Sequence, residues 1–199
     1  MGIVELLGLA GSLSLLAGWR LYLCVFAAGV AMRTGWVAAP EHLDWLAALA
    51  NPWVIGAAFI GLVAELFADK VAWIDSAWDA VHTAIRPVGG ALLTLAIIDP
   101  QDPAWQVVAV LLGGGAALLG HSAKAGTRAI VNASPEPFSN VVVSTGEDIS
   151  TFALVAAALA NPVLAVVVFV VALLFSMALL ILLRRLLRRL GGSRGSQIP

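Results

Sequence analysis

The chain alternates long apolar runs with short polar stretches, and this pattern predicts an all-α protein built from membrane-spanning helices. The apolar runs cover residues 3–32, 45–64, 87–98, 104–120 and 152–183. A helix needs about 20 apolar residues to cross a bilayer core of about 30 Å, so several runs need help from neighbouring polar residues. The sequence therefore predicts a polytopic transmembrane helical bundle of about 5–6 spans, with broken or re-entrant helices.

Local signals modify three of these runs. AGWR at 17–20 interrupts the first run, and Asn-Pro at 161–162 divides the last into a short helical piece and a span. The run at 87–98 reaches spanning length only when it is extended back to Asp75. The polar stretch at 133–151 is expected to be an external loop.

Composition supports a membrane protein and excludes an independent water-soluble domain. Of the 199 residues, 61% are hydrophobic and 12% are charged, and the mean hydropathy is +0.97. The surface of a soluble domain carries far more charge than this. We expect one transmembrane domain at residues 1–183 and a basic tail at 184–199.

The two ends of the chain predict its orientation. Six Lys or Arg residues precede residue 183, whereas five arginines follow it. Basic segments beside a span stay on the cytoplasmic side and contact anionic lipid, so we expect a cytoplasmic C-terminus and no nucleic-acid binding. Because Glu5 is present and no basic residue precedes it, the first apolar run is expected to be retained rather than cleaved.

Two short motifs recur in the same order. AALANP at 47–52 reappears at 157–162, and AGWR at 17–20 is matched by AGTR at 125–128. This self-similarity predicts an internal duplication.

The duplication places repeat 1 at about 3–98 and repeat 2 at about 104–183. Three crossings in repeat 1 would insert repeat 2 in the opposite orientation. We therefore expect an inverted internal repeat, with the N-terminus outside.

Ionisable residues gather on one face of the helix predicted from Asp75 onward. The face is formed, at spacings of four, three and four residues, by Asp75, Asp79, His82 and Arg86. On the preceding helix Glu65 and Asp69 are also four apart, and Lys70 follows directly. Since the apolar run is too short without the residues before it, we expect at least Asp79, His82 and Arg86 within the bundle.

A second charged face follows in the second half of the chain. Its members, again at helical spacing, are His121, Lys124, Arg128 and Asn132. An ionised group in a membrane costs from about 2.5 to more than 10 kcal/mol, so such groups are paired, hydrated or functional. We expect pairing between the faces, with Asp75 or Asp79 against Lys124 or Arg128.

Internal repeats, interrupted helices and buried charge are typical of secondary transporters and related channels. The irregular Pro-Glu-Pro segment at 135–137 adds to this pattern, because irregular backbone at membrane depth lines cavities. We expect a small transporter or channel for a small ion, either a cation or an ion moved with protons, without a cofactor. The expected pathway residues are Arg20, Glu65, Asp69, Lys70, Asp75, Asp79, His82, Arg86, His121, Lys124, Arg128, Asn132, Glu136, Asn140, Glu147 and Asp148. The candidate metal ligands are Glu65, Asp69, Glu136, Glu147 and Asp148.

Two other functions stay open from the sequence. Arg20, Lys124 and Arg128 suit the phosphate of an anionic lipid, which would make the protein a phospholipid or polyprenyl-phosphate transporter or binding protein. The charged faces of a membrane scaffold would serve folding alone. The glycines at 113–115 allow close helix packing, either within one chain or in a homo-oligomer.

Catalysis is not expected. The chain contains no HExxH motif, and its one GxSxG match, GGSRG at 191–195, lies in the basic tail after the last apolar run. His82 and His121 suit a proton relay, because histidine titrates near neutral pH, or a structural hydrogen-bonding role.

Several of these motifs occur together in one known family. They are GWRLYL at 18–23, Glu65 with Asp69 and Lys70, Asp75, the run from Trp78 to Pro87, Lys124 to Arg128, Asn132, and SPEPFSN at 134–140. With this combination the chain resembles the bacterial integral-membrane family named domain of unknown function 4126, over nearly its whole length up to the arginine-rich tail. The resemblance implies a bacterial inner-membrane location and names no substrate.

Overall fold

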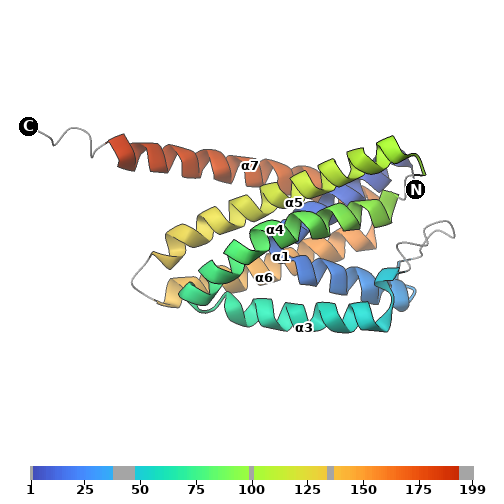
Figure 1. Cartoon of the computed structure of the whole chain (residues 1–199), viewed down its shortest axis with the longest axis horizontal. Helices are drawn as coiled ribbons and strands as arrows, with labels where there is room; N and C mark the ends of the chain where they lie inside the picture. The colour runs from blue at the N-terminus through green and yellow to red at the C-terminus, as the bar shows by residue number, and fades with distance from the viewer. Residues whose placement is uncertain (1, 38–47, 99–100, 134–136, 193–199) are drawn as a thin grey trace, which may run out of the picture.

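The computed structural model describes residues 2–37, 48–98, 101–133 and 137–192, which form helices and short connections without a strand. The helices are α1 (Ile3–Arg33), α3 (Pro52–Ala68), α4 (Ala72–Ile98), α5 (Pro103–Asn132), α6 (Pro137–Ala160) and α7 (Pro162–Gly192) (Figure 1). Within the described ranges, five are long and apolar enough to cross a membrane, and α3 is shorter at 17 residues. The predicted all-α bundle is confirmed, and the chain has the helices of a multi-pass membrane protein.

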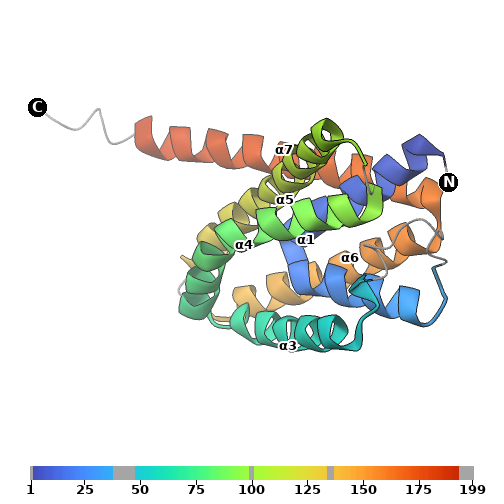
Figure 2. The ribbon, with the colours of Figure 1, turned by 45° about the vertical axis from the view of Figure 1, so that its right-hand side comes forward.

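Helix α1 is broken at Arg20 and folds back on itself. The Arg20 backbone has φ −142° and ψ 80°, which are extended values inside an otherwise helical segment. Figures 1 and 2 show the two ends of α1 at the same end of the molecule, with the break deep in the bundle. The interruption predicted at 17–20 is confirmed, and α1 consists of two half-helices that run in opposite directions.

The first half of α1 lies at the centre of the hydrophobic core. Leu13, Leu15 and Leu16 are almost completely buried. The same core cluster includes, from α4, α6 and α7, Leu93, Ile97, Val155, Ala158, Ala165, Val168 and Ala172. Between membrane helices, such contacts stabilise mainly through van der Waals packing. This packing holds the first half of α1 and therefore fixes the position of the break.

Three helices begin with the same capping arrangement. The side-chain Oδ1 atoms of Asn51, Asp102 and Asn161 each accept a hydrogen bond of 2.7–2.9 Å from the backbone N–H two residues on. A proline follows each cap, where its missing N–H costs nothing and its fixed φ suits the first helical position. Both AALANP copies therefore start a helix, and the division predicted at 161–162 is confirmed.

The two AALANP copies point the same way, so the prediction of an inverted repeat is wrong. The helices that follow them, α3 and α7, start at the same end of the molecule and run in the same direction (Figure 1). The prediction took three passes for repeat 1, but the break in α1 makes them four. Between the start of α3 and the start of α7 the chain likewise passes along the bundle four times, in α3, α4, α5 and α6. An even number of passes returns the chain to the end from which it started. The division into repeats at about 3–98 and 104–183 stays a prediction.

Two helices are longer than their apolar runs. Helix α4 starts at Ala72 and continues through Pro87, as predicted for the extended run. Helix α6 starts at Pro137, so the loop predicted at 133–151 is wrong over most of its length. The error arose because α6 turns Asn140 and Ser144 into the bundle, and these polar side chains make a buried helical face look like a solvated loop.

Helices α4 and α5 approach each other at a glycine. A Cβ atom at Gly113 would lie 2.1 Å from Thr94 Oγ1 and 2.6 Å from the carbonyl oxygen of Gly90, whereas one at Gly115 would meet nothing within 4 Å. Small residues allow membrane helices to pack this closely. At Gly113, the close packing that the sequence suggested occurs within one chain.

We expect Gly113→Ala to lower the free energy of unfolding by about 1–3 kcal/mol, because the added methyl group forces α4 and α5 apart. Gly115→Ala is the matched control in the same run, and it should be neutral or stabilise by up to about 1 kcal/mol through helix propensity. Denaturant titration of the protein in detergent measures both. Equal unfolding midpoints would contradict the close contact.

Candidate functional site

The break in α1 places Arg20 inside a group of polar and ionisable side chains, hereafter the charged cluster. Five elements contribute to it: α1, the C-terminal end of α3 with the turn after it, α4, α5 and α6. Its members are Arg20, Glu65, Asp69, Lys70, Asp75, Asp79, His82, Arg86, His121, Lys124, Arg128, Asn132, Asn140, Glu147 and Asp148. Eleven of these are buried, and Lys70, Asn132, Glu147 and Asp148 are half-buried. Only Glu136 of the predicted site lies outside the described residues.

Arg20 joins α1 to α3 and α6. Its Nη1 lies 2.5 Å from Asp69 Oδ2, and its Nη2 pairs with Asp148 Oδ1. Lys124 donates to the same Asp69 oxygen at 2.8 Å, and Lys70 donates to Asp148 Oδ2 at 3.1 Å. Two carboxylates therefore hold three cations, in a region where an unpaired charge would be costly.

Arg86 organises a second group between α3, α4 and α5. Its guanidinium donates to Glu65 Oε1 at 2.7 Å, Asp79 Oδ1 at 3.1 Å and His121 Nδ1 at 2.6 Å. Arginine only donates hydrogen bonds, so Nδ1 of His121 is the acceptor and carries no proton. The other ring nitrogen, Nε2, then donates to Thr83 Oγ1 at 2.9 Å. These contacts hold His121 as a neutral imidazole in one tautomer.

Arg128 forms a third group near the start of α4. It donates to Asp75 Oδ2 at 2.9 Å, to the Asp69 carbonyl oxygen at 2.5 Å and to the Asn140 carbonyl oxygen at 3.2 Å. Asn132 donates to the same Asp75 oxygen at 2.6 Å. Arg128 therefore ties α5 to the α3–α4 turn and to α6.

The expected pairing of the two charged faces is confirmed in part. Asp75 pairs with Arg128, as predicted. Asp79 pairs with Arg86 of its own helix, and Lys124 pairs with Asp69 instead of either predicted partner. Asp69 lies at the C-terminal end of α3, and its carboxylate is 2.8 Å from Lys124 Nζ. Lys124 therefore pairs with this acid rather than with an acid of α4.

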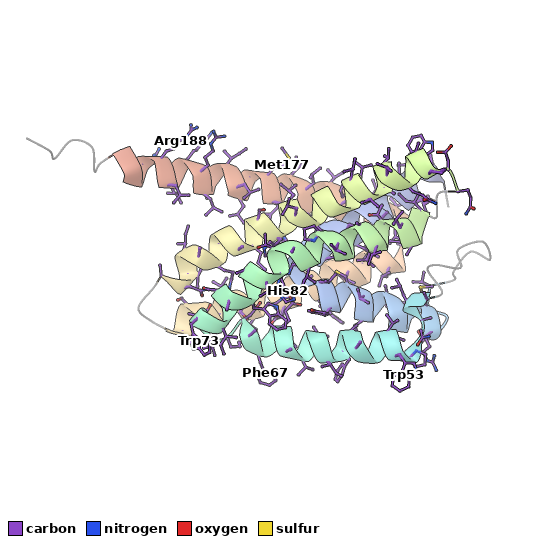
Figure 3. All side chains as sticks on the ribbon, in the orientation of Figure 1. Trp53, Phe67, Trp73, His82, Met177 and Arg188 are labelled. Carbon is purple, nitrogen blue, oxygen red and sulfur yellow. The ribbon has the colours of Figure 1, made fainter. Side chains whose placement is uncertain are left out.

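His82 lies at the edge of the cluster, between α3 and α4 in Figure 3. Its Nδ1 is 2.8 Å from the Trp78 carbonyl oxygen and its Nε2 is 3.0 Å from the Tyr22 hydroxyl. The Trp78 ring stacks on the imidazole with a centroid distance of 4.3 Å. Because the carbonyl can only accept, Nδ1 of His82 carries a proton.

The four candidate metal ligands that the structure describes, Glu65, Asp69, Glu147 and Asp148, do not assemble into a metal site. Among residues 2–37, 48–98, 101–133 and 137–192, no three His, Cys, Asp or Glu side chains are grouped as metal ligands. Asp69 and Asp148 face arginine and lysine, and Glu65 faces Arg86. These cations take the carboxylate oxygens that a hard metal ion would need.

One carboxylate of the cluster is in excess. Five bases, namely Arg20, Lys70, Arg86, Lys124 and Arg128, face six acids, namely Glu65, Asp69, Asp75, Asp79, Glu147 and Asp148. Glu147 is the weakly paired member, because its Oε2 is 4.0 Å from Arg20 Nη2 and finds no hydrogen-bond partner in the part of the chain that the structure describes. With neutral histidines the cluster carries one net negative charge.

Sequence reasoning missed several contact residues. Ser144 is buried, its hydroxyl accepts from Lys70 at 2.5 Å, and Tyr22 and Thr83 bind the two histidines. The helical spacing of Asn140, Ser144 and Asp148 would have identified Ser144. Tyr22 and Thr83 carry no comparable pattern.

Two grooves flank the second half of α1. The groove beside α3 and α4 measures about 810 Å³ and has only uncharged lining residues, among them Tyr22 and Trp53. The groove between α3 and α6 measures about 660 Å³, is mostly apolar, and includes Arg20 and Asp148 in its lining. Only the second groove therefore reaches the ion pairs of the charged cluster.

Comparison with known proteins supports the resemblance seen in the sequence. The family model described as domain of unknown function (DUF4126) matches residues 7–183, a range that includes every member of the charged cluster. Neither the curated proteins nor the solved structures contain a match to the chain. Because the family model covers most of its length, the chain belongs to the DUF4126 family.

Proposed function

We propose that this protein is a transporter or channel that moves protons, alone or together with a small ion. Glu147 carries the mobile proton. The observation that supports this most is the excess carboxylate, since Glu147 is half-buried and has one distant cation at 4.0 Å. A carboxylate in such a place gains a proton at little cost, because protonation removes an unpaired buried charge.

The placement of the aromatic residues supports the membrane orientation. Trp53 and Trp73 are exposed at opposite ends of the long axis in Figure 3, where indole rings mark the two membrane interfaces. Arg188 lies on α7 at the Trp73 end, together with the exposed Arg184, Arg185 and Arg189. We place this basic end, and with it the C-terminus, in the cytoplasm of a bacterial cell.

In this orientation α1 is a re-entrant helix that enters and leaves at the non-cytoplasmic side. Its break brings Arg20 to the inner end of the charged cluster, which extends toward the cytoplasmic end through Asp69 and Asp75. Proton access to Glu147 is proposed from that side. The groove on the other side of Arg20 has a mostly apolar lining, which disfavours the entry of water and protons from outside.

The other functions receive less support. A divalent cation would have to displace the bases that hold Glu65, Asp69 and Asp148. A lipid phosphate would have to compete with carboxylates already bound to Arg20 and Arg128. Proton movement requires neither displacement.

A flux assay tests the proposal. Purified protein is placed in liposomes that contain a pH-sensitive dye, and a potassium diffusion potential set with valinomycin drives proton entry. Wild-type protein should acidify the lumen faster than protein-free liposomes, and Glu147→Gln should reduce the rate to that background, because glutamine cannot carry a proton.

Glu5→Gln is the matched control. Glu5 lies in the first turn of α1, accepts from the Gly2 backbone N–H at 2.9 Å, and is outside the cluster. It should keep the wild-type rate. Background flux in wild-type protein, or full flux in Glu147→Gln, would refute the proposal.

A further inference from the structure

The groove between α3 and α6 combines an apolar wall with a charged inner end. Its floor is the second half of α1, and its lining includes Phe26, Trp36 and Phe152. Trp36 and Phe152 are exposed by 62% and 61%, so the groove opens toward the side of the bundle that faces lipid. Its volume of about 660 Å³ falls within the range of roughly 300–1,000 Å³ that small-molecule sites occupy.

The charge at the inner end favours a cation. Asp148 lines the groove, and Glu147, its neighbour in the chain, is the carboxylate that the five bases leave in excess. Arg20 lines the same end, but Asp69 and Asp148 already neutralise it. A ligand with one positive charge therefore brings the cluster to neutrality, whereas an anion adds to its negative charge.

The aromatic walls favour an organic cation over a hydrated metal ion. Rings of phenylalanine and tryptophan attract a positive charge placed over their faces, most strongly when water is excluded. The neighbouring groove of about 810 Å³ has no acid or base among its lining residues. The two grooves thus differ in the feature that would recognise a charge.

We propose that the groove between α3 and α6 binds a lipophilic organic monocation, such as a quaternary ammonium or phosphonium compound, which enters from the membrane and exchanges with the proton of Glu147. This rests on the proposed function, because the exchanged proton is the one assigned to Glu147. One cation binds as one proton leaves, so charge is balanced at the site.

Binding to the purified protein in detergent tests the site without any flux. The probe is tetraphenylphosphonium, and the isosteric anion tetraphenylborate controls for simple partitioning. Tetraphenylphosphonium should bind, and its apparent Kd should fall by up to about tenfold per pH unit as pH rises, because reciprocal linkage couples cation binding to loss of one proton. Equal binding of the anion would overturn the proposal.

Two tryptophan variants, one in each groove, test in which groove the cation binds. Ala156→Trp fills the charged groove and should weaken cation binding at least about tenfold, because the indole ring occupies the space that the cation would take. Ala57→Trp makes the same change in the neighbouring groove and should leave binding unchanged. Equal effects of the two would overturn the proposal.

A second pair of variants, which only shorten a side chain, tests the site if Ala156→Trp does not fold. Phe152→Ala should weaken binding about two- to fivefold through loss of a cation–π contact. Phe138→Ala removes an exposed phenylalanine of the same helix outside the groove and should have no effect. Equal binding in these two variants would also refute the site.

The outcomes separate this inference from the proposed function. Glu147→Gln should abolish the pH dependence of cation binding as well as proton flux. Proton flux that depends on Glu147, without any tetraphenylphosphonium binding, would refute the cation site and leave the proposed function standing. Groove-dependent binding whose pH dependence survives in Glu147→Gln, with no proton flux, would refute both the exchange and the proposed function.

Discussion

Arg86→Gln is expected to lower the free energy of unfolding by about 3–5 kcal/mol, the loss typical of breaking a buried ion pair from one side. Arg86 is fully buried and donates to Glu65 at 2.7 Å and to Asp79 at 3.1 Å. Glutamine is shorter and uncharged, so Glu65 would remain as a buried carboxylate without a cation. Denaturant titration of the protein in detergent measures the loss.

Two further variants separate ion pairing from general damage. Arg33→Gln changes an exposed arginine whose contact is the Ala50 carbonyl oxygen at 3.3 Å, and it should stay within about 0.5 kcal/mol of wild type. Adding Glu65→Gln to Arg86→Gln should recover about 1–3 kcal/mol, since it removes the charge left behind. If Arg86→Gln and Arg33→Gln unfold at the same denaturant concentration, the pairing contributes nothing.

Asp69→Asn should destabilise the protein by a similar amount, about 3–5 kcal/mol. Asp69 Oδ2 is shared by Arg20 at 2.5 Å and Lys124 at 2.8 Å, and all three side chains are buried. Arg20 keeps Asp148, but within the described chain Lys124 has no other ion pair. The main cost is therefore an unpaired lysine at membrane depth.

Lys124→Met in the Asp69→Asn background should restore part of that loss, because methionine fills similar space without a charge. Asp102→Asn is the matched control: Asp102 caps α5 through Ala104, and asparagine caps equally well, so stability should stay within about 0.5 kcal/mol. Unfolding midpoints are compared across the four proteins. No recovery in the double variant would show that Asp69 acts through something other than Lys124.

Some of the candidate site could be read from the sequence because helical periodicity is local. The spacing of Asp75, Asp79 and Arg86 places them on one face of α4 regardless of neighbouring helices. The same spacing could not name partners, since an ion pair depends on separations of about 2.5–4 Å between different helices. Asp79 pairs with Arg86, seven residues further along the same face of α4, instead of with a base of α5.

Polar helical faces were harder to recognise than apolar ones. The stretch at 133–151 has few apolar residues in sequence, yet from Pro137 onward it is helix α6. Two of its polar side chains, Asp148 and Ser144, contact Arg20 and Lys70, and nothing in the sequence places these two bases beside this stretch. A buried polar face and a solvated loop have the same composition, and only the partner across the bundle distinguishes them.

The sequence by itself determined that this is an all-α membrane protein, which helices carry charge, where Asn-Pro starts a helix and where α1 is interrupted. These properties follow from composition and short-range spacing. Only the tertiary structure decided that the interruption at Arg20 reverses the chain, that α3 and α7 run in parallel, and that Glu147 is left without a close cation. The dihedral angles of one residue reverse α1, and the packing of distant segments sets which charges meet; neither is encoded in local pattern.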